Sequence, residues 1–79
     1  MNNQPDIVVI IWRRNSDDRN APRRIVQAAV IGSANPCADR LEQNDRFSRA
    51  QRCLLRNGFT REFQERFGDF GISIFVRTS

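Results

Sequence analysis

Residues Ile7–Trp12, which read Ile-Val-Val-Ile-Ile-Trp, form the stretch that decides the fold. β-Branched side chains are stiff about χ1 and fit a pleated surface, so this run favours a β-strand over a helix. Alternate side chains of a strand point to opposite faces, and here both faces are apolar. The run therefore predicts a central strand that is buried on both faces. It is too short for a membrane span, which needs about 20 apolar residues.

The length of the chain, 79 residues, predicts a single domain over 1–79, of which Met1–Pro5 is expected to fray. A chain this short buries only about 60% of its unfolded surface and is marginally stable without help. One layer of helix covers only one face of a sheet. A strand that is apolar on both faces therefore makes the chain a candidate homodimer.

The segments around this strand predict the rest of a sheet. Asn15–Ala21 is rich in turn formers, and Arg23–Ile31 reads as a second strand that forms a hairpin with the first. Ile72–Arg77 alternates between apolar and other residues and predicts a strand. Phe59–Phe67 has phenylalanines four apart, which fits a helix or a strand. A strand is favoured because residues 68–71, Gly-Asp-Phe-Gly, resemble a turn.

A helix is expected between these strands. Asn35 before Pro36 is a good N-cap followed by proline at the first helical position, so the pattern predicts a helix over Pro36–Asn57 with Gly58 as the C′ residue. Asn44–Asp45 could interrupt it by capping a fresh helix. The sequence thus predicts an α+β fold, in which a small antiparallel sheet (order ββαββ or ββααβ) has a helix layer packed on one face.

The two cysteines, Cys37 and Cys53, are expected to be free thiols. On one helix they would lie about 24 Å apart at 1.5 Å per residue, whereas a disulfide needs Cα atoms within roughly 7 Å. Free, buried thiols indicate a reducing compartment. The chain also lacks the pattern of a signal peptide, so a cytoplasmic location is expected.

The residue types needed for most catalysis are missing. The sequence has no Lys, His or Tyr, and neither cysteine has a histidine to activate it. A thiol at a helix N-terminus can have a lowered pKa, so Cys37 is the one residue to test for reactivity. Two cysteines without histidine do not make a zinc site, and the neighbouring Asp17 and Asp18 lie in an expected turn. We therefore expect a protein that is not an enzyme and has no catalytic residue, metal or cofactor.

Charge is the informative feature. All 13 basic residues are arginine, and the formal net charge is +4. Five arginines and no acidic residue occur between 46 and 61, and three of them share one face of the expected helix. A second cluster flanks the first turn, where Trp12 adjoins it and could stack a base, although packing in the core is the better interpretation. The candidate binding residues are Arg46, Arg49, Arg52, Arg56 and Arg61, with Arg13, Arg14, Arg23 and Arg24 in the second cluster.

Arginine forms a planar fork of donors that suits phosphates, carboxylates and base edges. We therefore expect a small binding protein that docks on nucleic acid or on a nucleoprotein complex. The alternative is a phage-type, anti-CRISPR-like inhibitor or adaptor that blocks a bacterial protein complex by occupying an acidic surface. Nothing in the pattern points to a membrane surface, and the partner's identity stays open between these two classes.

Overall fold

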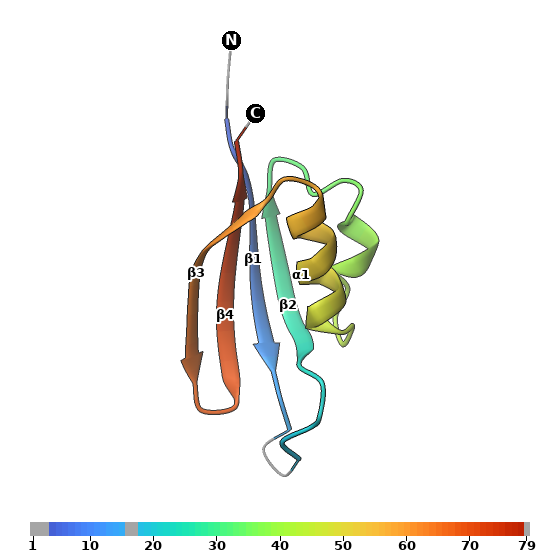
Figure 1. Ribbon diagram of the computed structural model, residues 1–79, viewed down its shortest axis with the longest axis vertical. Coiled ribbons are helices and arrows are strands. Elements are labelled where there is room, and N and C mark those ends of the chain that lie inside the picture. Colours follow the sequence, from blue (N-terminus) through green and yellow to red (C-terminus); the bar gives the residue numbers. More distant parts are fainter. Residues whose placement is uncertain (1–3, 16–17, 79) are drawn as a thin grey trace.

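The structure, a computed structural model, describes residues 4–15 and 18–78 (Figure 1). Met1–Asn3 of the expected frayed end, and Asp17, lie outside these residues. The expected α+β fold with a small antiparallel sheet and a helix is confirmed. None of the described helices is long and apolar enough to cross a bilayer. In chain order the elements are β1 (Asp6–Arg13), β2 (Arg24–Ile31), the 3₁₀ helix η1 (Ala38–Arg40), α1 (Phe47–Arg56), β3 (Thr60–Phe67) and β4 (Phe70–Arg77).

The strand that contains Ile7–Trp12 is central, as predicted. The sheet order is β2-β1-β4-β3, and every neighbouring pair is antiparallel. β1 and β2 form the expected hairpin, with a bulge where Ile11 pairs with Gln27 and Trp12 pairs with Ile25. The segment Phe59–Phe67 contributes strand β3, so its strand interpretation is also confirmed.

Only one face of the sheet is buried, which corrects the prediction that both are. On the helix side, Val8, Ile10, Trp12 and Phe75 are at most 4% exposed. Figure 1 shows α1 and η1 grouped on one side of the sheet. Residues paired directly across an antiparallel ladder share a face, and the register therefore defines the opposite side. We call it the open face; it comprises Ile7, Val9, Ile11, Ile72, Ile74 and Val76, which are partly buried, with the exposed Ile31, Phe63, Phe67 and Phe70 around them.

The long helix expected over Pro36–Asn57 is wrong, because the chain is interrupted near Asn44 as the alternative anticipated. Asn44 has a φ of 72°, and Arg46 is extended and forms an isolated bridge with Arg24 at the start of β2. The Asn44 N–H donates to the Ile25 carbonyl, at 2.7 Å. This pairing with β2 holds the backbone extended, so α1 begins only at Phe47.

The end of α1 follows the sequence prediction. Asn57 is the C-cap, and Gly58 takes the left-handed conformation with a φ of 90°. The Phe59 N–H donates to the Leu54 carbonyl at 3.0 Å, which is the bond that closes a Schellman motif. Phe59 is thereby placed in the core, 2% exposed, immediately before β3.

Cys37 and Cys53 form a disulfide, which corrects the prediction of two free thiols. Their Cα atoms are 5.8 Å apart. The prediction failed because Cys37 does not belong to α1, and the turn at Asn44 lets its segment fold back on the helix. The side-chain amide of Asn57 donates to the Cys53 carbonyl at 2.8 Å and contacts the Cys37 sulfur at 3.5 Å. The reducing compartment and the cytoplasmic location were inferred partly from free thiols, and they lose that support.

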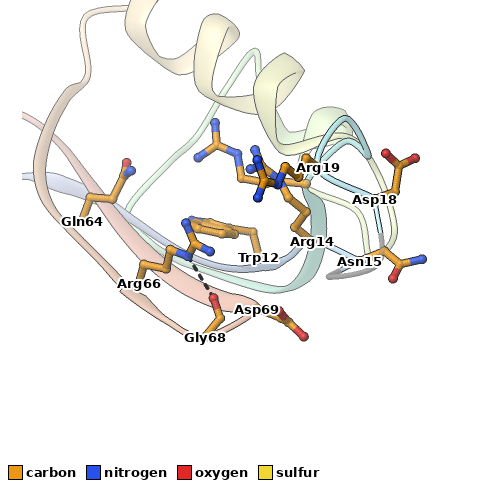
Figure 2. Close-up of a pocket in the computed structure, with 10 residues that line it drawn as sticks. Trp12, Arg14, Asn15, Asp18, Arg19, Gln64, Arg66, Gly68 and Asp69 are labelled. Carbon is orange, nitrogen blue, oxygen red and sulfur yellow. Dashed lines mark hydrogen bonds between the residues drawn. The ribbon is translucent and has the colours of Figure 1, made fainter.

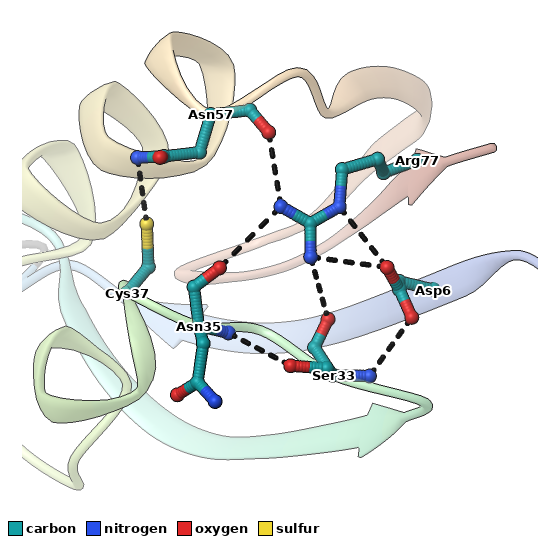
Figure 3. Close-up of polar contacts among 6 residues, drawn as sticks. All are labelled: Asp6, Ser33, Asn35, Cys37, Asn57 and Arg77. Carbon is teal, nitrogen blue, oxygen red and sulfur yellow. Dashed lines mark hydrogen bonds and ion pairs between the residues drawn. The ribbon is translucent and has the colours of Figure 1, made fainter. Parts of the chain in front are cut away.

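Arg77, at the end of β4, joins three parts of the fold (Figure 3). Its Nε donates to Asp6 Oδ2 at 3.0 Å, within the ion pair between these residues. Its Nη atoms donate to the carbonyls of Ser33 at 3.2 Å and Asn57 at 3.0 Å, and its guanidinium lies over the Phe59 ring. Arg77 is therefore a structural residue, engaged by β1, the loop after β2 and the end of α1.

We expect this network to make stability depend on pH below about 4. The hydrogen bond from the Ser33 N–H, followed by the hydrogen bond from Arg77, lowers the pKa of Asp6. A carboxylate with a depressed pKa stabilises the fold above its unfolded pKa of about 3.9, and this contribution is lost as pH falls through the folded pKa. Urea unfolding should therefore show Asp6→Asn to be less stable than wild type at pH 6, with the difference shrinking towards pH 2. A difference that stays constant would contradict this role.

Candidate nucleic-acid interface

Arginine side chains from separate segments line a hollow of about 510 Å³ at the turn end of the sheet. Figure 1 shows the β1–β2 loop and the β3–β4 turn at the same end. The Arg14 N–H donates to the Asp69 carbonyl at 2.9 Å and so joins them. We call this site the arginine hollow and define it by Trp12, Arg14, Arg19, Arg23, Gln64 and Arg66.

The arginines of the hollow come from two parts of the fold, the β1–β2 connection and β3. Arg14 follows β1, Arg19 lies in the β1–β2 loop, Arg23 precedes β2, and Arg66 is on β3. The Arg66 Nε donates to the Gly68 carbonyl at 2.9 Å (Figure 2). Figure 2 shows Trp12 in the middle of this group. Residues more than 50 positions apart thus converge because β1 and β3 both pair with β4.

Trp12 supports the hollow from the core. It is 4% exposed, and its indole N–H donates to the buried Ser73 hydroxyl at 3.1 Å. The Arg23 guanidinium lies 4.9 Å from the indole centroid and 4.7 Å from the Phe47 centroid, within the range of cation–π contacts. The indole is therefore covered, and its arrangement agrees with core packing rather than with the stacking of a base.

The electrostatics of the arginine hollow favour an anionic ligand. Burial, followed by repulsion from Arg14 and Arg61, lowers the pKa of Arg23, although an arginine stays protonated in proteins. Arg14 Nε is buried without a hydrogen-bond partner. The ion pair found within residues 4–15 and 18–78, Arg77–Asp6, involves none of the arginines of the hollow. An anion in the hollow would relieve the repulsion and supply acceptors for the guanidinium donors.

Acidic side chains lie at the rim of the hollow rather than inside it. Asp18 and Asp69 both line it, and Figure 2 shows their carboxylates directed away from Trp12. Asp18 Oδ1 accepts a hydrogen bond from the Asn20 N–H at 2.9 Å, which holds the loop. Asp18 thus lies in a turn, as the sequence predicted.

The three arginines expected on one face of the helix do lie together. Arg49, Arg52 and Arg56 are exposed on α1, opposite the buried Phe47, Ala50 and Leu54. They line a shallow hollow of about 370 Å³ together with Arg40 of η1. We call these four residues the helix stripe. It is a second basic surface, more open than the arginine hollow.

The other candidate arginines are dispersed. Arg46 is exposed at the start of α1, and Arg61 Nη1 donates to Gln51 Oε1 at 2.9 Å. Arg13 pairs with Arg24 across β1 and β2, and both line a third hollow on the β2 side, apart from Arg14 and Arg23. Arg13 lies over the Phe70 ring at 5.3 Å, and Arg24 donates to the Asn44 carbonyl at 3.2 Å. The second cluster is thus divided into two pairs.

Sequence reasoning missed three arginines of these surfaces: Arg19, Arg40 and Arg66. None is part of a regular spacing with the others, because each reaches its surface through the tertiary fold. The alternation of β3 was the one signal present, since it places Gln64 and Arg66 on the face opposite Phe63 and Phe67.

Metal-ligating side chains are not clustered in the part of the chain that the structure describes. Residues 4–15 and 18–78 contain no group of three or more His, Cys, Asp or Glu side chains that could hold a metal ion. In comparisons with family models, curated proteins and solved structures, none matched the chain. Its function must therefore be inferred from the two arginine surfaces.

Proposed function

We propose that the protein is a non-enzymatic binding protein that docks on nucleic acid, alone or within a nucleoprotein complex, and that the arginine hollow is its main contact. The observation that carries the proposal is the convergence of Arg14, Arg19, Arg23 and Arg66 on one hollow. Their guanidinium groups take no part in an ion pair among the described residues. Guanidinium groups grip phosphates through paired, charge-assisted hydrogen bonds.

The surroundings of the hollow support a polyanion rather than a single small anion. The helix stripe adds four further arginines on another part of the surface, and the net charge of the chain is +4. Several separated contacts to a phosphate backbone add to affinity and to its salt dependence. Because the indole of Trp12 is covered by Arg23, this binding is expected to show little preference for base sequence.

A pair of variants with equal charge loss tests which surface binds. We expect Arg19→Gln/Arg66→Gln to weaken binding of a labelled DNA or RNA about a hundredfold or more, because each of the two lost charged hydrogen bonds costs about 1.5–3 kcal/mol. The slope of log affinity against log salt should fall by about two, one for each phosphate contact. Fluorescence anisotropy at several salt concentrations gives both quantities.

The matched control is Arg49→Gln/Arg52→Gln in the helix stripe, which removes the same charge from exposed positions of α1. It should weaken binding less than the double substitution in the hollow. A larger loss for the helix-stripe variant would move the site to α1, as the sequence pattern alone predicted. Equal losses would mean that binding follows net charge and would contradict a site in the hollow.

A further inference from the structure

We infer that the open face of the sheet is the interface of a homodimer, in which a second copy of this chain stacks its own open face on the first. The face lies opposite α1, and no described element covers it. Its apolar side chains include Phe67 at 58%, Ile31 at 61%, Phe70 at 44% and Phe63 at 43% exposure. A contiguous apolar surface of this kind marks an interaction site on a monomeric unit.

The area of the open face reaches the lower limit for a specific interface. Four strands at about 4.8 Å spacing, each of eight residues at about 3.3 Å, span about 19 by 26 Å, or about 500 Å². Two copies face to face would cover about 1,000 Å², the size at which specific interfaces begin. The pleated surface suits sheet-on-sheet packing, in which side chains of both faces interdigitate.

Charge distinguishes a second copy from other occupants. Along the part of the open face spanned by Ile7–Ile11, the register places a single ionisable residue, Glu65, opposite Ile72 on the β3 edge. Arg13 and Arg24 pair with each other at the turn end of this face, where Arg13 is stacked on Phe70. Two positive groups and one negative group give this face a net charge of about +1, so two copies repel each other far less there than on either arginine surface.

The other surfaces would repel a second copy. The helix stripe and the arginine hollow each carry four arginines, and their self-association would bring eight like charges together. In an isologous twofold contact the same surface of both copies meets, so that surface must not strongly repel its own copy. The open face meets this condition. Dimerisation there would leave both arginine surfaces uncovered, because they lie elsewhere on each copy.

Sedimentation velocity of the full chain, from about 5 to 500 µM, tests this dimer. Wild type should reach twice the 9.2 kDa mass of the chain. Phe63→Glu should raise the dimer dissociation constant about a hundredfold or more, since it buries an unpaired charge in the interface. The matched control is Leu55→Glu, which removes an apolar side chain of similar exposure (47% against 43%) from α1 and should leave the dimer intact.

Other results would overturn the inference. Wild type that stays monomeric over this range would do so, as would a dimer that Leu55→Glu abolishes and Phe63→Glu does not. A band of dimer mass on a non-reducing gel would assign the mass to intermolecular disulfides. Monomeric protein that floats with phosphatidylcholine–phosphatidylglycerol vesicles, and loses this property in Phe63→Glu, would assign the open face to a lipid surface instead. Both variants replace exposed side chains, and circular dichroism verifies that each is folded.

Discussion

Gly71→Ala is expected to lower the free energy of unfolding by about 3 kcal/mol or more. A Cβ at Gly71 would overlap the Trp12 ring at Cζ2, Cε2 and Cη2. Overpacking of a filled core costs about 1–3 kcal/mol, and displacement of the indole would break its hydrogen bond to Ser73, leaving buried polar groups unpaired at about 1–3 kcal/mol. Urea unfolding followed by the fluorescence of Trp12, the single tryptophan, measures the change.

Gly68→Ala is the comparison variant, because it tests the free-energy cost of a left-handed backbone in the same hairpin, without a steric overlap. Gly68 has a φ of 62°, and a Cβ there would meet no atom within 4 Å. Only the left-handed backbone opposes alanine, at about 1–2 kcal/mol. We therefore expect Gly71→Ala to be clearly the more destabilising of the two. Similar losses for both, or a stable Gly71→Ala, would contradict the packing of Trp12 against Gly71.

Reduction of the disulfide is expected to lower the free energy of unfolding by about 3 kcal/mol. Cys37 and Cys53 are 16 residues apart in sequence, and closing a loop of about this length restricts the unfolded chain by that amount. Such a loss is large for a small domain, whose core alone rarely supplies more than about 3–5 kcal/mol. Urea unfolding with and without a phosphine reductant gives the difference.

Two controls show whether the loss of stability on reduction comes from breaking the disulfide bond. Thiol titration in denaturant should find no reactive group before reduction and two after it. The variant Cys37→Ala/Cys53→Ala should be about as unstable as the reduced protein and should not respond to reductant. Two titratable thiols in untreated protein, with a stability that reductant leaves unchanged, would restore the original expectation of free cysteines.

The strands of the sheet could be predicted from the sequence where the residue types or their alternation within one segment are typical of a strand. Ile7–Ile11 is β-branched throughout and lies in the central strand, and the alternation in Ile72–Arg77 correctly predicted β4. What the pattern could not decide is whether an apolar face is covered. Ile7, Val9 and Ile11 are as apolar as their buried neighbours, yet no described element packs on them.

The predictions of one long helix and of two free thiols failed together, because the second depended on the first. Asn44–Asp45 was the local signal for an interruption, and the bridge between Arg24 and Arg46 is the tertiary contact that holds the chain extended there. Once a continuous helix was assumed, distance excluded a bond between Cys37 and Cys53. Side-chain spacing predicted the three stripe arginines on α1, since a helix fixes them locally.

The arginine hollow was only partly predictable for a similar reason. Arg14 and Arg23 flank the first turn and could be placed there from the hairpin. Arg66 is more than 40 residues farther along the chain and joins them only because β3 and β1 flank the same strand, β4. A site assembled across a sheet in this way leaves no periodic signal in the sequence.

Binding of labelled single-stranded and duplex DNA and RNA to the purified protein, measured by anisotropy across a salt series, tests directly whether the arginine hollow is a nucleic-acid site. Binding should persist near physiological salt, with a slope of log affinity against log salt that corresponds to about four phosphate contacts, one for each arginine of the hollow. Absence of binding even at low salt would contradict it. The arginines would then be assigned to an acidic protein surface, as in the inhibitor alternative.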